Sequence, residues 1–422
     1  MKLTTWIFIG MLAGIGVGFM CHELLPTPES AKATAGYISL FTDIFLRLIK
    51  MIIAPLVFST LVVGIAHMGD TAAIGRIGIK TMAWFISASL FSLLLGLVMV
   101  NLLRPGEALN LPLPDASAST NLKVASLSFK EFVTHLVPRS AFEAMANNEI
   151  LQIVVFSVFF GAAAAALGDK AKAMINWIEE LSHVILKITG YVMSLAPIAV
   201  FAAMASVVTT SGLGILVTYG KFVVEFYFSL GLLWILISFA AWVILRERVF
   251  TLLRMIREPL LLSFTTASSE AAYPKTLEQL ERFGAKKKIV SFVLPLGYSF
   301  NLDGSMMYCT FAVLFIAQAY NIQLTLLQQV TMLLILMVTS KGMAGVPRAS
   351  LVVIAATLAT FNIPEAGLLL IMGVDQFLDM GRSATNVIGN SVATAVVAKW
   401  EGELGAGEAP SRPRRGAAAA AA

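Results

Sequence analysis

The stretch VDQFLDMGRSATNVIGN, residues 374–390, places charged side chains between two apolar runs, AGLLLIMG and SVATAVVA. Asp375, Asp379 and Arg382 therefore lie where the flanking sequence has the composition of a membrane-spanning helix. A charge at the centre of such a helix costs about 2.5–3.5 kcal/mol even on the gentler insertion scales. The stretch predicts a helix that turns these groups towards the protein interior, where they have a functional role.

The overall composition indicates an all-α polytopic membrane protein. Of the 422 residues, 58% are hydrophobic and only 13% are charged, whereas about 25% are charged in a soluble domain. The net charge of +5 comes largely from basic loops, which favours the anionic cytoplasmic leaflet as a contact and not nucleic acid. Cys21 and Cys309 lie in or beside apolar segments, and the four histidines lack metal-ligand spacing, so neither a disulfide nor a metal site is expected.

The first half of the chain contains simple apolar segments of spanning length. They are expected at 3–23, 38–66, 80–103, 150–168, 183–210 and 214–245. Basic residues follow the second, fourth and sixth of these segments, on the side where Lys2 begins the chain. Because basic loops stay in the cytoplasm, the N-terminus is predicted to be cytoplasmic and the long polar link to face outside.

After residue 250 a different pattern occurs twice. Residues 260–284 and 333–359 each have apolar flanks and a centre of small, polar or helix-breaking residues, which indicates a helical hairpin that enters the membrane and returns. Each hairpin is followed by a span with a polar centre, YSFNLDG at 298–304 and the stretch at 374–390. The repeated scheme predicts eight transmembrane helices plus two re-entrant hairpins, arranged as the inverted repeats of a secondary transporter. The low-complexity tail is expected to be disordered and cytoplasmic.

At about 100° per residue, the polar side chains of 374–390 fall within an arc of roughly 80°. This stripe consists of Asp375, Asp379, Arg382, Asn386 and Asn390, with Ser383 at its edge. One interpretation is that Asp379 and Arg382 merely neutralise each other and lock helix packing. The other is a ligand site, in which Arg382 binds a carboxylate, Asp379 binds an ammonium group and Asn386 binds either.

Two further clusters are candidates for binding. In NLDG, Asn301 and Asp303 beside Gly304 permit an unwound helix that coordinates a monovalent cation, although a kink with a solvated aspartate is the alternative. In the first hairpin tip, Ser268 and Ser269 stand at a helix start, where free N–H groups favour an anion and simple capping is the competing explanation.

Several motifs together resemble the dicarboxylate/amino acid:cation symporter family. They are SSEAAYPKTLEQLERFG, LPLGYSFNLDGSMMY, SKGMAGVPRASLVV, VDQFLDMGRSATNVIGNSVATAVVAKWE and, in the fourth segment, NEILQIVVFSVFFGAA. That family includes glutamate transporters, archaeal aspartate transporters and bacterial C4-dicarboxylate carriers, and this chain looks most like the bacterial proton/sodium glutamate symporter branch.

The resemblance implies a homotrimer in membrane lipid that works as an elevator, with both termini cytoplasmic in a bacterial inner membrane. The implied division is 1–79 for scaffold helices 1–2, 80–103 for transport-domain helix 3, 104–210 for the extracellular link and scaffold helices 4–5, 211–400 for the remaining transport domain, and 401–422 for the tail. Neither a cofactor nor an enzymatic activity is implied.

The resemblance also assigns the substrate site. Arg382 matches the residue that binds the substrate side-chain carboxylate, Asp379 the one that binds the α-amino group, and Asn386 the one that contacts the α-carboxylate. Further matching contacts are Ser268, Ser269, Ser305, Ser383, Gly345 and Val346. Because a carboxylate at 379 would repel a dicarboxylate, glutamate and aspartate are the expected substrates. The alternatives are a C4-dicarboxylate symporter, a passive channel and, distantly, an intramembrane hydrolase, for which the sequence lacks the usual motifs.

The coupling ion is less clear because the chain departs from the family's sodium-binding pattern. The matching positions are Ser89, Gly297, Ser299, Asn301, Asp303, Ser340, Lys341, Met343 and Asn390. Asn390 replaces an aspartate of one sodium site, and Phe85 and Ala88 replace a tyrosine and a threonine of another. The proton-carrying glutamate of mammalian members is Cys309 here. Proton symport is therefore the hypothesis, with sodium as the alternative, and the candidate proton carriers are Asp303, Asp375, Asp379 and Glu270.

Overall fold

The structure is a computed structural model of the chain, and it describes residues 3–25, 27–66, 71–107, 134, 137–212, 219–340, 349–372, 374–405 and 407. Helices account for almost all of these residues. The N-terminal helices are α1 (Leu3–Leu24), α2 (Pro28–Ala66), α3 (Thr71–Leu103), α5 (Ala141–Ala146), α6 (Ile150–Leu167), η1 (Gly168–Ala171), α7 (Lys172–Met193) and α8 (Ala196–Ser211). The later helices are α10 (Gly220–Leu245), α11 (Arg248–Met255), α12 (Arg257–Thr266), η2 (Glu270–Ala272), α13 (Tyr273–Phe283), α14 (Lys287–Phe300), α15 (Asp303–Ala319), α16 (Leu326–Thr339), α17 (Ala349–Thr360), η4 (Glu365–Gly367), α18 (Leu368–Met372) and α19 (Asp375–Trp400).

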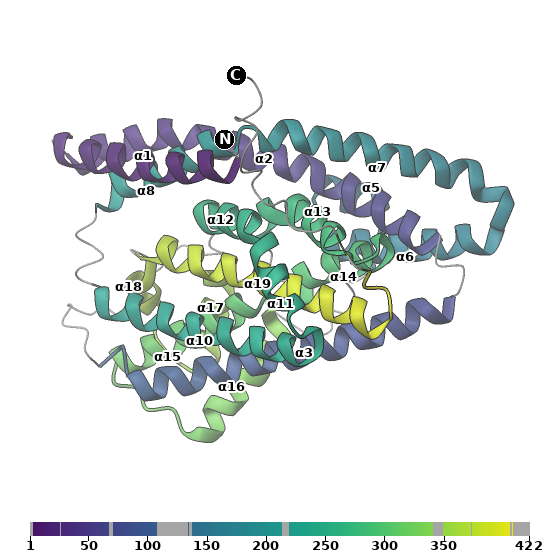
Figure 1. Cartoon of the computed structure of the whole chain (residues 1–422). Coiled ribbons are helices and arrows are strands. Elements are labelled where there is room, and N and C mark those ends of the chain that lie inside the picture. The colour runs from purple at the N-terminus through teal and green to yellow at the C-terminus, as the bar shows by residue number, and fades with distance from the viewer. Residues whose placement is uncertain are drawn as a thin grey trace, which may run out of the picture.

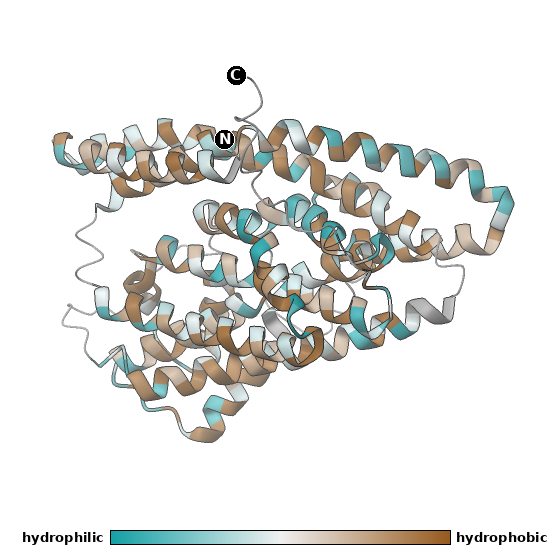
Figure 2. Cartoon of the chain, in the orientation of Figure 1, coloured by the Kyte–Doolittle hydropathy of each residue, from teal (hydrophilic) through white to brown (hydrophobic). Residues whose placement is uncertain are grey.

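The helical content and its apolar character agree with an all-α membrane protein. Among the described residues, six helical segments are long and apolar enough to cross a membrane. Figure 2 shows apolar residues along most helices and hydrophilic residues along α13. α19 does not belong to the six, because its polar stripe lowers the hydropathy of a helix that is otherwise long enough.

One predicted segment was wrong. The range 183–210 was expected to be a single span, but α7 ends at Met193 and α8 starts at Ala196, with Pro197 in its first turn. Proline lacks an N–H group and is tolerated in the first turn of a helix, where no partner for that N–H is needed. The other early segments overlap observed helices, although α2 begins at Pro28 and α3 at Thr71, earlier than the expected residues 38 and 80. Residues 214–218 of the sixth expected segment lie outside the described residues.

The helices form two connected layers, and α19 lies at the centre of one of them (Figure 1). In one layer α1 packs along α8, α8 along α2, and α2 along α6 and α7. Gly10, Gly14 and Gly18 line the side of α1 that meets α8, and a Cβ at any of them would collide with α8 backbone oxygens. This close approach is the small-residue packing common between membrane helices. In the other layer α10, α12, α14 and α15 surround α19.

The predicted helix break and the two predicted hairpins lie in the second half of the chain. The helix over 287–319 breaks at Asn301 and Leu302, between α14 and α15. In the first predicted hairpin, α12 and α13 are joined by residues 267–272, which begin with Ala267 in the left-handed region at a φ of 49° and end with η2. In the second, α16 and α17 flank residues 341–348, which lie outside the described residues.

The start of the C-terminal tail docks on the protein, contrary to the expectation of disorder from residue 401. Glu401 pairs with Arg76 at 3.0 Å and with Lys80 at 2.7 Å. Glu403 pairs with Lys286 and, at 2.6 Å, with Lys288. Residues 401–405, called the C-terminal strap below, also hydrogen-bond through the backbone to residues 284–286.

Candidate functional site

The polar stripe of α19 is buried inside the molecule. Asp375, Asp379, Arg382 and Asn386 have no exposed surface, and Asn390 is 1% exposed. The expectation that the stripe faces the interior is therefore confirmed. The structure adds that every residue from 377 to 398 is buried, so protein covers the apolar sides of this helix as well.

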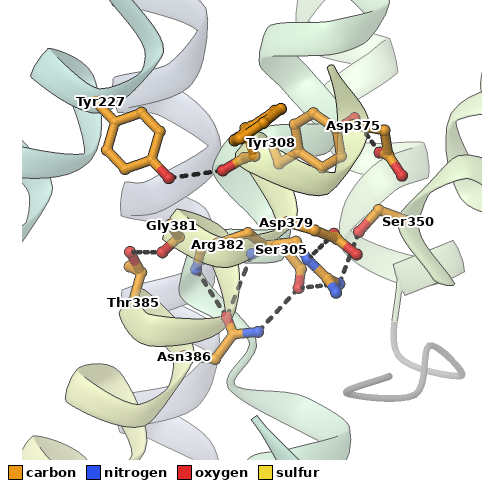
Figure 3. A network of polar contacts seen from close by, with 12 residues as sticks. Tyr227, Ser305, Tyr308, Ser350, Asp375, Asp379, Gly381, Arg382, Thr385 and Asn386 are labelled. Atoms are coloured by element: carbon orange, nitrogen blue, oxygen red, sulfur yellow. Dashed lines mark hydrogen bonds and ion pairs between the residues drawn. The ribbon is translucent and has the colours of Figure 1, made fainter. Parts of the chain in front are cut away.

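A buried ion pair lies at the centre of the stripe (Figure 3). Nε of Arg382 lies 2.6 Å from Oδ1 of Asp379, one turn earlier on the same helix. Nη1 of Arg382 donates hydrogen bonds to Oγ of Ser305 at 3.2 Å and to Oγ of Ser350 at 3.0 Å. α15 and α17 therefore each contribute one hydroxyl to the guanidinium. The contact of Ser350 with Arg382 was not predicted from the sequence, although Ser350 belongs to the motif SKGMAGVPRASLVV.

Asn386 joins α19 to the break between α14 and α15. Its Oδ1 accepts hydrogen bonds from the backbone N–H groups of Gly304 at 2.9 Å and Ser305 at 3.3 Å, and its Nδ2 donates to Oγ of Ser305 at 3.1 Å. The first N–H groups of a helix have no partner within that helix, so Asn386 caps α15. Arg382, Asn386 and Ser305, all predicted to bind substrate, thus form one connected group.

A second polar cluster occupies the helix break itself. Nδ2 of Asn301 donates to Oδ2 of Asp303 at 3.1 Å and to Oδ1 of Asn390 at 3.3 Å. The hydroxyl of Ser92 on α3 lies 2.8 Å from the carbonyl oxygen of Ala88 and 3.3 Å from Oδ1 of Asp303, and Ser89 donates to the carbonyl oxygen of Phe300 at 3.2 Å. Asn301, Asp303 and Asn390, predicted as coupling-ion ligands, are therefore brought together.

Ser92 was not predicted as part of this cluster. Its i+3 spacing from Ser89 places both hydroxyls on the same face of the helix and would have indicated it. Two amide atoms of the cluster, Oδ1 of Asn301 and Nδ2 of Asn390, are buried and have no hydrogen-bond partner within the described part of the chain. Such atoms are costly unless something binds them.

The remaining predicted coupling-ion residues are spread over several elements. Gly297 approaches Asn390 so closely that a Cβ would collide with the amide. Ser299 is half-buried in the last turn of α14, and Ser340 is buried after α16. Lys341 and Met343, like the substrate-site candidates Gly345 and Val346, lie outside the described residues.

The first hairpin tip meets α19 beside the ion pair. Ala267 packs in an apolar cluster with Phe377 and Met380. Ser268 accepts a hydrogen bond from the N–H of Ala271 at 3.3 Å, which is the capping role weighed above as the alternative to anion binding. The side chain of Ser269 is fully buried, and its hydroxyl has no hydrogen-bond partner among the residues that the structure describes.

The four candidate proton carriers lie in different surroundings. Asp375 accepts a hydrogen bond from the hydroxyl of Tyr308 at 2.6 Å. Asp379 is in the ion pair and Asp303 is in the cluster at the helix break. Glu270 begins η2 and is half-buried. Ser383, predicted at the substrate site, is buried, and its hydroxyl has no partner in the described ranges.

This geometry suits a ligand that carries both signs of charge. A zwitterion can place a carboxylate on Arg382 and an ammonium group on Asp379, so each buried charge exchanges one partner for another. An uncompensated buried charge is very costly, and this exchange avoids one.

Comparisons with known proteins identify the family. The family model described as "Sodium:dicarboxylate symporter family" matches residues 3–400. A protein of Bacillus subtilis (strain 168) named "Proton/sodium-glutamate symport protein" is 39% identical over 407 residues, covering 95% of this chain and 93% of that protein. A protein of Geobacillus stearothermophilus with the same name is 39% identical over 94% of each chain. A "C4-dicarboxylate transport protein" of Cupriavidus pinatubonensis (strain JMP 134 / LMG 1197) is 43% identical, covering 94% of this chain and 92% of that protein. The family match over nearly the whole chain, together with these identities, shows that the chain belongs to the sodium:dicarboxylate symporter family.

Proposed function

We propose that this protein is a secondary active symporter that imports acidic amino acids, glutamate or aspartate, by coupling them to protons. The observation that carries the proposal is the fully buried ion pair of Asp379 and Arg382, 2.6 Å apart. A site for an amino acid needs both charges, whereas a site for a dicarboxylate needs only the cation.

In the proposed site Arg382 binds the side-chain carboxylate of the substrate, because its planar fork matches a carboxylate. Asp379 binds the ammonium group and Asn386 the α-carboxylate. The remaining contacts come from both hairpin tips and the polar centres of the last two spans: Ser268, Ser269, Ser305, Ser383, Gly345 and Val346.

The coupling ion is proposed to be the proton, with sodium as the alternative. The amide of Asn390 is a weaker cation ligand than a carboxylate, and this supports the proton. Asp303, Asp375, Asp379 and Glu270 are the candidate carriers. The sodium alternative uses Asn301, Asp303 and Asn390 with Ser89, Gly297, Ser299, Ser340, Lys341 and Met343. The family description and the names of the glutamate relatives support a cation of one of these two kinds.

The proposed architecture is that of an elevator. Eight transmembrane helices and two re-entrant hairpins divide into a scaffold (1–79 and 104–210) and a moving transport domain (80–103 and 211–400). The packing of α1, α2, α6, α7 and α8 in one layer, and of α10, α12, α14 and α15 around α19 in the other, supports this division. The proposed assembly is a homotrimer in the bacterial inner membrane with both termini in the cytoplasm.

A second candidate function is C4-dicarboxylate symport, which the relative at 43% identity favours. Overall identity averages over the whole chain, however, whereas substrate choice depends on the few groups that touch the ligand. A dicarboxylate on Arg382 would leave Asp379 without an ammonium partner, so we place this candidate second.

Competition in proteoliposomes tests the proposed function. Purified protein takes up labelled glutamate while unlabelled aspartate, succinate or lysine is added in excess. The expected result is that aspartate displaces the label and that succinate and lysine do not. Displacement by succinate but not by aspartate would overturn the proposal in favour of the second candidate.

A further inference from the structure

Ser350 lies in the first turn of α17 and is fully buried. Its Oγ accepts a hydrogen bond from Nη1 of Arg382 at 3.0 Å, which is shorter than the 3.2 Å bond from the same nitrogen to Ser305. Hydrogen bonds from a charged donor are stronger than neutral ones. In Figure 3 the side chain of Ser350 points towards Arg382 from a separate helix.

The thiol of Cys309 lies beside the hydroxyl of Ser350. Cys309 stands one turn after Ser305 on α15. A guanidinium only donates, so the hydroxyl of Ser350 accepts the bond from Arg382. Ser350 on α17 therefore adjoins α19 through Arg382 and α15 through Cys309.

Another buried hydroxyl on the same helix behaves differently. Thr357 donates to the carbonyl oxygen of Val353 at 2.8 Å, four residues earlier, so its bond stays within α17. This is the ordinary way in which a helical serine or threonine satisfies its hydroxyl. Ser350 instead contacts two other helices, α15 and α19, at the group proposed to bind the substrate.

We propose that Ser350 is a positioning residue for Arg382, an inference that rests on the proposed substrate site. Nε of the guanidinium is held by Asp379 and Nη1 by Ser350 and Ser305, so the plane of the group is fixed from three side chains. Ser350 fixes this plane from α17, the helix that follows the second predicted hairpin tip. It thereby sets the direction in which Arg382 presents its N–H groups to the side-chain carboxylate of the substrate.

The test compares Ser350→Ala with Thr357→Val, which removes only the hydroxyl that bonds within the helix. Each variant is assayed for glutamate uptake and for thermal stability with and without glutamate. Ser350→Ala is expected to raise KM about tenfold, with the maximal rate within about twofold of wild type. It also loses most of the stabilisation by glutamate, while the stability of the substrate-free protein stays the same. Thr357→Val keeps the wild-type KM, and Ser350→Thr, which retains a hydroxyl, restores KM to within about threefold.

An equal KM for Ser350→Ala and Thr357→Val would overturn the inference. So would a Ser350→Ala protein whose maximal rate and substrate-free stability fall with KM unchanged, because that is the effect of a packing residue. Failure of the proposed function is distinguishable, since wild-type protein would then take up succinate and not glutamate. In that case the same comparison is made with succinate, whose carboxylate also needs Arg382.

Discussion

At the scale of single residues, the buried ion pair of Asp379 and Arg382 bears on both the stability of the fold and the proposed binding of substrate. Breaking a buried pair by removing one partner costs about 3–5 kcal/mol, because the other charge is left uncompensated. In the proposed site the pair would keep both charges compensated until a substrate with both signs of charge binds. The stripe that contains it could be predicted from residue types and helical spacing alone. The bond between Ser350 and Arg382 could not be predicted in this way, because no local pattern indicates which hydroxyl of a distant helix reaches the arginine.

Replacing Asp379 with Asn tests the assigned roles. The variant loses the partner for the substrate ammonium group, so glutamate uptake is expected to fall at least about a hundredfold. Succinate, which has no ammonium group, is expected to compete better than in wild type. The measurement is labelled uptake with each competitor, and Asp169→Asn, in the exposed 3-10 helix η1, is the control. Unchanged glutamate uptake by Asp379→Asn would remove Asp379 from the site.

Replacing Ser92 with Ala tests the cluster at the helix break. Ser92 bonds within its own helix to the carbonyl oxygen of Ala88 at 2.8 Å and also contacts Oδ1 of Asp303 at 3.3 Å. Because Ser92→Ala removes the contact with Asp303, it is expected to raise the concentration of coupling ion needed for half-maximal uptake about three- to tenfold. The ion is varied as sodium and, separately, as pH. Ser157→Ala is the matched control, because that buried hydroxyl donates within its own helix at 2.7 Å. If the two variants have the same ion dependence, the cluster does not bind the coupling ion.

At the scale of elements, the site depends on how closely α15 approaches α19. A Cβ on Gly304 would lie 2.7 Å from Cβ of Thr385, and it would also press on the backbone of Arg382. The sequence predicted a break at YSFNLDG because glycine and polar residues interrupt an apolar run. It did not predict this contact, because α19 lies far along the chain from the break. Gly304 and Asn386, which are hydrogen-bonded to each other across the contact, are 82 residues apart in the sequence.

Gly304→Ala is therefore expected to be destabilising by about 1–3 kcal/mol, because overpacking forces one helix away from the other. The shift also disturbs the cap that Asn386 places on α15, so glutamate binding weakens as well. Thermal unfolding of the detergent-solubilised protein, with and without glutamate, measures both effects. Gly231→Ala is the control, since nothing lies within 4 Å of a Cβ at that position. Equal unfolding temperatures for the two variants would contradict the close packing.

At the scale of the whole molecule, the C-terminal strap ties the end of α19 to α3 and α14. Hydrogen bonds from Lys286 and Lys288 lower the pKa of Glu403 below its ordinary value. Burial raises the pKa of Glu401, but hydrogen bonds from Arg76 and Lys80 outweigh it and the net pKa is lowered. A lowered pKa in the folded state means that the stabilisation is complete above the ordinary glutamate value and is lost as pH falls through the lowered value.

The strap is therefore expected to stay docked at neutral pH and to detach as the pH falls through the lowered pKa values of Glu401 and Glu403. Hydrogen exchange of the Gly405 amide, which bonds the carbonyl oxygen of Gly284 at 2.8 Å, reports the docking. At neutral pH the double variant Glu401→Gln, Glu403→Gln is expected to exchange faster, and Glu107→Gln, in an exposed pair, is expected to match wild type. Protection that persists in the double variant would show that the ion pairs do not hold the strap.

The sequence predicted the helical class and most spans because hydropathy and length decide them directly. It missed the division of 183–210, since a first-turn proline starts a new helix without changing the hydropathy. It also placed disorder too early at the C-terminus, because the ionic partners of Glu401 and Glu403 come from distant helices. Long-range contacts of this kind have no local pattern in the sequence.

Concentrative uptake in proteoliposomes shows whether this protein transports acidic amino acids together with protons. Proton and sodium gradients are set independently, and labelled glutamate and succinate are followed in parallel. The account predicts that glutamate accumulates against its gradient when only a proton gradient is applied, that a protonophore abolishes this, and that succinate does not accumulate. Accumulation of glutamate under a sodium gradient but not under a proton gradient would contradict proton coupling, and accumulation of succinate but not of glutamate would contradict the substrate.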